Sequence, residues 1–134
     1  MVHLDRQSQL ALLAETLVDG ALIVIGEARY ALSPDGLECE FALSVADDWR
    51  GRGLGTLLIA DVECRARTLG ARYLCGDVLR SNELMKALVR KNGFLTSYLP
   101  RDARLVRIAK DLALSRAAGP CEAVNTASDL ATAA

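Results

Sequence analysis

The clearest pattern along the chain is an alternation of apolar and polar positions over residues 37–45. Because side chains alternate between the two faces of a β-strand, this segment predicts a strand with one apolar face and one polar face. A second apolar run covers residues 21–32, and the turn sequence Ser33-Pro34-Asp35-Gly36 joins the two segments. We therefore expect them to form an antiparallel hairpin.

The apolar spacing becomes helical after Arg50, and Gly70 is well placed to end that helix. A second helix is expected to begin at a cap residue, Ser81, and to end at Gly93. Further strands are expected over residues 71–79, 94–99 and 103–110, and residues 9–15 form a first element that is either strand or helix.

This order of elements predicts an α+β fold with a mixed sheet. A hairpin followed by a strand–helix–strand crossover combines antiparallel and parallel pairs, and the helices flank the central sheet. The length suits one domain, which we expect to cover residues 1–114. Residues 115–134 are rich in Ala, Ser and Thr without periodicity, so we expect a disordered C-terminal tail.

Composition narrows the classes of partner and location. The net charge is −1, so the overall charge predicts neither a nucleic-acid partner nor binding to anionic membranes. No apolar run approaches the ~20 residues that span a bilayer, and the N-terminus does not resemble a signal peptide, so we expect a cytoplasmic protein. The chain has one histidine, His3, and no C-x-x-C pair, so we expect no metal site.

The junction between the hairpin and the first helix carries the most chemical information. Three glycines, Gly51, Gly53 and Gly55, alternate with Arg50, Arg52 and Leu54. The first N–H groups of a helix lack internal partners, so amides and guanidinium groups here could bind a diphosphate. The alternative is a flexible turn with solvated arginines. The spacing matches neither a P-loop nor the G-x-G-x-x-G dinucleotide fingerprint.

The segment Arg50-Gly51-Arg52-Gly53-Leu54-Gly55 resembles the R/Q-x-x-G-x-G/A motif of the GNAT superfamily of acetyl-CoA-dependent N-acyltransferases. Residues 78–94 resemble the segment of the family that contains the "N…A..L..K.GF" helix. The segment 40–45 looks most like the GNAT domains of bacterial protein-lysine acetyltransferases. The resemblance covers residues 9–112 and implies the GNAT fold, acetyl-CoA as cosubstrate and a primary amine as acceptor.

The resemblance also implies a shortened N-terminal region. Members of the family usually begin with a strand and one or two helices that help to form the acceptor wall. About twenty residues precede Ala21, so we expect the first strand and most of those helices to be missing. A partner subunit, as in a homodimer, could supply the missing wall.

Glu40 is the candidate general base, because a carboxylate near the cleft can take the proton of the attacking amine. Glu38 is in reserve on the same face, and for both the alternative is a solvated outward residue. The resemblance implies that the backbone N–H groups of Leu43 and Val45 hold the thioester carbonyl. Val89 stands where many members have a tyrosine acid.

The resemblance further assigns the coenzyme's diphosphate to residues 50–56, with Thr56 adding a hydroxyl, and a cofactor contact to Asn82. Thr56 and Asn82 could equally be ordinary residues of a helix N-terminus. Two functions follow from these assignments: an N-acetyltransferase acting on a protein lysine or a small amine, or a non-catalytic module that binds acetyl-CoA. A generic nucleotide-phosphate binder is a third and weaker reading.

Overall fold

The predicted hairpin is present in the computed structural model, which describes residues 2–8 and 11–114. Strands β3 (Ala21–Leu32) and β4 (Glu38–Val45) pair in antiparallel fashion. In the turn between them, a carboxylate oxygen of Asp35 accepts hydrogen bonds from the Ser33 hydroxyl at 2.6 Å and the Leu37 N–H at 3.0 Å. The local bonding of Asp and Ser thus fixes the turn.

Two strands precede the hairpin, β1 (Val2–Ser8) and β2 (Ala11–Val18). They pair with each other, and β2 pairs with β3 through a turn in which Asp19 and Gly20 have φ of 51° and 80°. Two consecutive positive φ values are typical of the tight turns that match the twist of a hairpin. The expectation that the first strand is missing was therefore wrong, although no helix precedes β3 within the described residues.

Helix α1 (Leu54–Thr68) packs against one face of the sheet. Leu54, Leu58 and Val62 are almost completely buried against the apolar side chains of β3 and β4. Each such side chain contributes roughly 1.5–3 kcal/mol by leaving water. The helix ends just before Gly70, whose φ of 86° suits a glycine terminator.

The second half of the chain completes a seven-stranded sheet in the order β1-β2-β3-β4-β5-β7-β6. Its elements are β5 (Tyr73–Leu79), α2 (Glu83–Lys91), β6 (Leu95–Tyr98) and β7 (Leu105–Asp111). Helix α2 is capped by Asn82 rather than by Ser81, because the Asn82 side-chain oxygen accepts the Met85 N–H at 3.1 Å. The mixed sheet with flanking helices confirms the predicted fold class.

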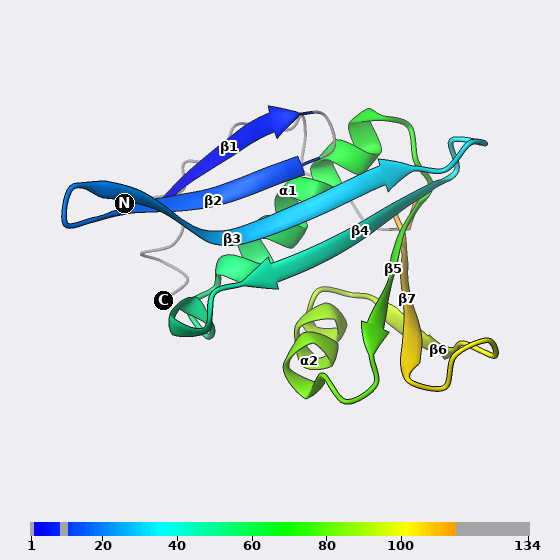
Figure 1. Ribbon diagram of the computed structural model, residues 1–134. Coiled ribbons are helices and arrows are strands. Elements are labelled where there is room, and N and C mark those ends of the chain that lie inside the picture. Colours follow the sequence, from blue (N-terminus) through cyan, green and yellow to red (C-terminus); the bar gives the residue numbers. More distant parts are fainter. Residues whose placement is uncertain (1, 9–10, 115–134) are drawn as a thin grey trace.

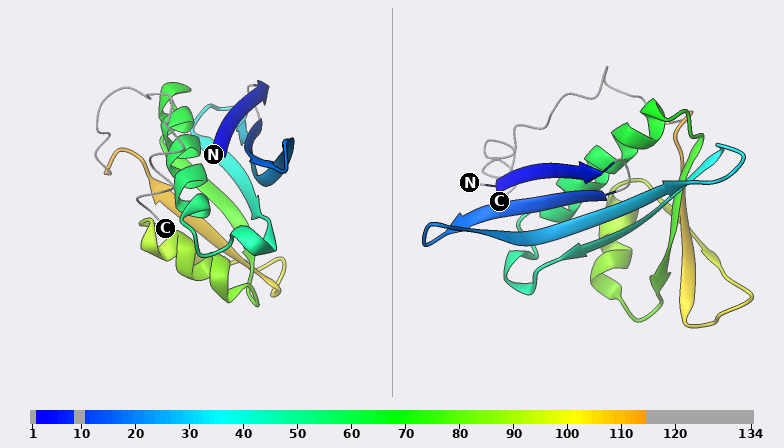
Figure 2. Two further views of the ribbon diagram at one scale, coloured as in Figure 1. Left: turned by 90° about the vertical axis from the view of Figure 1, so that its left-hand side faces the viewer. Right: turned by 45° about the horizontal axis from the view of Figure 1, so that its top comes forward.

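The parallel strands β4 and β5 pair over a short stretch and then separate. Their register runs from Glu38 opposite Tyr73 to Glu40 opposite Cys75 and extends no further in the described residues. Figure 1 shows the two strands diverging from their shared end, with α2 beside the lower part of β5. Figure 2 shows α1 lying along one side of the sheet. The opposite face of β4 carries exposed residues.

Candidate functional site

The divergence of β4 and β5 creates a cavity of about 140 Å³. Small or apolar side chains of β4 form one wall, and the end of β5 forms the other, with α2 and β7 closing the base. The lining residues are Phe41, Ala42, Leu43, Asp77, Val78, Leu79, Asn82, Met85 and Ile108. An open cavity between two strands leaves room for an extended ligand arm.

The main chain of β4 presents alternate polar groups to this cavity. Ala46 donates its N–H to Ile25 of β3, and groups two residues apart point the same way. In β4 the main-chain N–H and C=O groups of the even-numbered residues therefore point toward β3, and those of the odd-numbered residues point toward β5. The hydrogen bond from the Tyr73 N–H to the main-chain oxygen of Leu37 agrees with this assignment. Past Glu40 the β5 ladder has ended, so the N–H groups of Leu43 and Val45 point toward the space that β5 has left.

The glycine loop follows β4 directly. A short 3₁₀ turn, η1 (Asp47–Trp49), leads into Gly51 and Gly53, whose φ values are 77° and 83°. Such angles strain any residue with a Cβ. Gly53 caps α1 without a side-chain hydrogen bond, and the first intrahelical bond runs from Leu57 N–H to Gly53 O. The earlier N–H groups of the helix therefore lack an internal acceptor and suit an anion.

The two arginines of the loop are exposed, but each already has a partner. Arg50 pairs with Asp47 at 3.2 Å, and the guanidinium of Arg52 lies 4.6 Å above the ring of Trp49. Exposed pairs of this kind are weak, so a strongly charged ligand could displace them. Sequence reasoning proposed both arginines for the phosphate site but did not foresee either of these contacts.

The other residues at the start of α1 have mainly packing roles. Leu54 is 1% exposed, so it can offer a ligand only its main chain. Gly55 packs closely against α2, since a Cβ there would lie 2.6 Å from Leu88. Thr56 is partly buried in the first turn of α1. The glycine at 55 thus serves helix–helix contact rather than backbone freedom.

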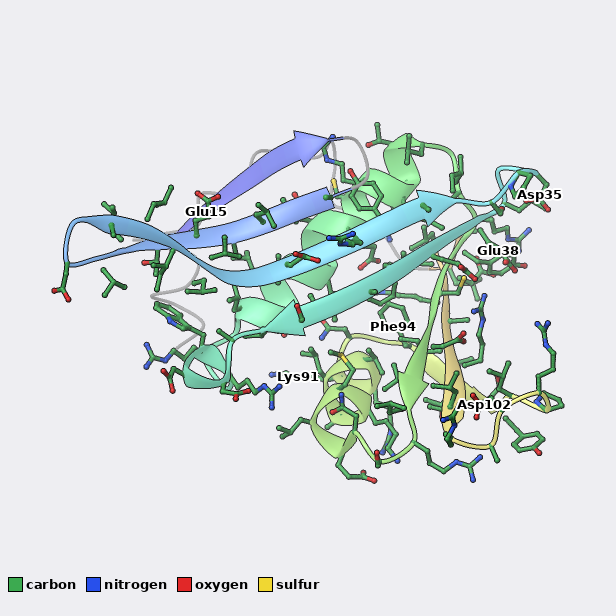
Figure 3. The ribbon with its side chains drawn as sticks, viewed as in Figure 1. Glu15, Asp35, Glu38, Lys91, Phe94 and Asp102 are labelled. Atoms are coloured by element: carbon green, nitrogen blue, oxygen red, sulfur yellow. The ribbon has the colours of Figure 1, made fainter. Side chains whose placement is uncertain are left out.

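Glu40 lies on the face of β4 that α1 does not cover, and Arg107 of β7 contacts it. The Arg107 guanidinium donates to Glu40 at 3.1 Å and to Asp77 at 3.0 Å, and it lies 3.9 Å from Glu38. Figure 3 places Glu38 near the end where β4 and β5 run together. Sequence reasoning proposed both glutamates but missed Arg107 and Asp77.

The same guanidinium donates to the Cys75 sulfur at 3.1 Å. Burial raises the pKa of the Cys75 thiol to about 11, and the charge of Arg107 lowers it only in part. Burial by itself would lower the pKa of Arg107, but its hydrogen bond to Asp77 and the nearby negative groups raise it above the usual value. At neutral pH the cluster therefore contains a protonated thiol and a guanidinium cation.

Asn82 has two roles in the geometry, because it caps α2 and also lines the cavity. Val89 is completely buried in the core, so its position on α2 offers no proton donor. Tyr73 and Tyr98 are the tyrosines that could replace Val89 as a proton donor, but neither lines the cavity. An arginine guanidinium lies over each of the two rings. Among the described residues, no group of His, Cys, Asp and Glu is arranged to hold a metal ion.

Comparison with known proteins identifies the family. The model of the acetyltransferase (GNAT) domain matches residues 11–95, more than half of the chain. The chain belongs to the GNAT family. Acetyltransferase PA5475 of Pseudomonas aeruginosa is 31% identical over 106 residues, which cover 79% of this chain. The chain spans 57% of the length of that relative.

Solved GNAT structures share the fold. The GNAT domain of PAT from S. lividans superposes with a TM-score of 0.63 at 26% identity, covering 75% of this chain and 59% of that one. The structure of yncA from Salmonella typhimurium, solved with its cofactor acetyl-CoA, gives 0.64 at 22% identity, covering 83% and 69%. None of the helices in the described part of this chain is long and apolar enough to cross a membrane.

Proposed function

We propose that this GNAT domain transfers the acetyl group of acetyl-CoA to a primary amine. The observation that carries the proposal is that main-chain N–H groups are open at two places, on the β5 side of β4 at Leu43 and Val45 and at the start of α1. GNAT acetyltransferases use acetyl-CoA as cosubstrate, and a structural neighbour was solved with it. The open cavity beside β4 is consistent with an extended thioester arm.

In this proposal the coenzyme's diphosphate lies at the glycine loop. The N–H groups at the start of α1 and the positive end of its dipole favour the negative charge. Arg50 and Arg52 leave Asp47 and Trp49 to contact the phosphate oxygens, and the Thr56 hydroxyl adds a donor. Asn82 contacts the thioester arm from the other wall of the cavity.

The reaction is direct attack of the amine on the thioester. The amine nitrogen bonds to the carbonyl carbon, the C–S bond breaks, and coenzyme A leaves as a thiolate that takes a proton. Glu40 accepts the proton that the amine loses, directly or through water, and the N–H groups of Leu43 and Val45 stabilise the oxyanion. The protonated state of Cys75 disfavours an acetyl-cysteine intermediate.

The acceptor is a lysine side chain of a protein or a small primary amine, and the activity is cytoplasmic. The face of β4 that α1 does not cover leaves Glu38 and Glu40 exposed, so a bulky acceptor could approach them.

Two measurements on the full chain test the proposal. Acetyl-CoA at a hundred times its Kd stabilises a native protein by about 2.7 kcal/mol, so the Tm should rise by several degrees. Release of free thiol from acetyl-CoA should then depend on an added amine or lysine peptide. A Tm that rises with ATP or NAD but not with acetyl-CoA would overturn the proposal. Arg50→Ala should weaken the acetyl-CoA effect, most clearly at low salt.

A non-catalytic acetyl-CoA module is the second candidate. It is favoured by the ion pair between Glu40 and Arg107 and by the buried Val89 where a proton donor is usual in the family. This candidate predicts the same rise in Tm without amine-dependent thiol release across a panel of amines and peptides.

We further propose that the domain forms a homodimer through the end of the β2–β3 hairpin. Apolar side chains are exposed there on both strands: Leu17, Val18, Leu22, Ile23 and Val24. Leu17 lies directly opposite Leu22, so apolar side chains of the two strands meet on one face, and an exposed apolar cluster is typical of an interaction site. Sedimentation of the wild type should give a dimer, and Leu22→Ser/Val24→Ser should give a monomer. A wild-type monomer at micromolar concentration contradicts the proposal.

A further inference from the structure

Arg107 connects the two strands that form the cavity at the point where they separate. On β7 it stands directly opposite Asp77 of β5, to which it donates a hydrogen bond at 3.0 Å. Its other terminal nitrogen reaches across β5 to Glu40 of β4 at 3.1 Å. Glu40 is opposite Cys75 in the last β4–β5 pair, so the contact lies at the apex of the divergence.

The contact restrains a carboxylate that is otherwise exposed. The Glu40 side chain is 61% exposed, and an exposed glutamate has several accessible rotamers. Arg107 is only 25% exposed and is anchored by Asp77 and by the Cys75 sulfur, so its guanidinium is a fixed point. The planar guanidinium presents its donors in a rigid fork that holds both carboxylates in a fixed geometry, whereas a lysine ammonium is a point charge on a flexible stem.

We infer that Arg107 is a positioning residue that fixes the orientation of the Glu40 carboxylate at the point where β4 and β5 separate. This inference rests on the proposed acetyl transfer. The hydrogen bond uses Oε1 of Glu40, so Oε2 is the oxygen that accepts the proton of the attacking amine. Asp77 holds the opposite end of the guanidinium, which fixes the direction from which Glu40 is held.

A double-mutant cycle tests the inference. The variants are Arg107→Gln, Glu40→Gln and the pair, assayed for amine-dependent thiol release with separate kcat and KM for the amine. Arg107→Gln should lower kcat about tenfold or more in the wild-type background, because small displacements of a reacting group are costly. In the Glu40→Gln background it should change kcat less than about twofold, because coupled residues are non-additive.

Two further variants control for the fold. Arg104→Gln removes an exposed arginine that is paired with Asp102 on the same segment, and it should leave kcat near wild type. Arg107→Lys keeps the positive charge but lacks the planar set of guanidinium donors, so it should give an intermediate kcat. This variant replaces Arg107→Gln in the cycle if Arg107→Gln does not fold. The rise in Tm with acetyl-CoA should persist in all variants.

An equal loss of kcat from Arg107→Gln in both backgrounds would overturn the inference, since Arg107 would then act only as a clamp between the strands. An unchanged kcat in the wild-type background would overturn it as well. Absence of amine-dependent thiol release by the wild type is a different result, because it contradicts the proposed function itself and with it the positioning role.

Discussion

Glu40 is both a surface residue and part of an ion-pair cluster. The alternating pattern of the sequence predicts that Glu40 and Glu38 share one face of β4, and the structure confirms that both lie on its exposed face. The Arg107 guanidinium lies 3.1 Å from Glu40 and 3.9 Å from Glu38. Glu40 belongs to the last β4–β5 pair before the strands separate, and Glu38 lies two residues before it. The shorter contact of Glu40 is consistent with the order proposed from the sequence, in which Glu40 is the candidate base and Glu38 is in reserve.

Glu40→Gln should lower kcat by about 10² to 10⁴ while acetyl-CoA still raises the Tm, because general base catalysis contributes about that much. The side chain does not line the cavity, so cofactor affinity should be kept. Glu38→Gln is the matched control and should have a smaller effect. An unchanged rate for Glu40→Gln would remove Glu40 from the reaction.

Asn82→Ala should destabilise the protein by about 0.5–2 kcal/mol, because it removes the cap of α2. Asn82→Ser can still accept the Met85 N–H and should recover most of that stability. Urea denaturation gives the free energy of unfolding, and calorimetry gives the acetyl-CoA affinity. If Asn82→Ser recovers stability but not affinity, the amide itself contacts the cofactor; recovery of both would leave only the cap.

At the scale of elements, the separation of β4 from β5 creates the cavity. Gly76 lies one residue past the last β4–β5 pair, and a Cβ there would lie 2.8 Å from the main-chain oxygen of Phe41. The absence of a side chain lets the two backbones approach closely at the point where their pairing ends. Phe94, labelled in Figure 3, packs with Phe41 at a ring distance of 5.5 Å.

Gly76→Ala should cost about 1–3 kcal/mol of unfolding free energy and weaken acetyl-CoA binding, because a rigid carbonyl group must move. Gly26→Ala is the comparison, since a Cβ there would meet the side-chain ends of Leu54 and Leu58 at 3.1 Å, which can shift. Chemical denaturation of both variants measures the difference. Equal costs would show that the Phe41 carbonyl is not the obstacle.

At the scale of the whole molecule, acid stability depends on exposed carboxylates spread along the chain. Hydrogen bonds from Ser33, Arg104 and Arg72 respectively lower the pKa of Asp35, Asp102 and Asp111 below the ordinary value of 3.8. A lowered pKa in the folded state gives stability that is present above 3.8 and is lost as the pH falls through the folded value.

The Tm should therefore change little from these groups between pH 7 and pH 5 and should fall as the pH drops below 3.8. Asp111→Asn should have a lower Tm at neutral pH and a shallower acid loss, because it lacks the titrating carboxylate. Thermal unfolding followed by circular dichroism across a pH series checks both expectations. A Tm that rises toward pH 3 would contradict the assignment.

Local patterns determined much of the fold from the sequence. The β3–β4 hairpin, both helices and the strands after them follow from periodicity and turn residues, which act between neighbours along the chain. The glycine loop was predictable for the same reason, since the φ values at Gly51 and Gly53 are demands of a short segment. The N-terminal strands were less clear, because an edge hairpin gains its pairing from β3 rather than from its own pattern.

Only the tertiary structure decided which groups meet at the cavity. Arg107 and Glu40 are 67 residues apart and come together through the order β4-β5-β7, in which β7 lies beside β5. A one-dimensional pattern cannot report such a contact, because it depends on strand order and register and on where β4 and β5 part. The sequence by itself therefore determined the elements from β3 onward and the glycine loop, and the packing of the sheet determined the cluster around Glu40.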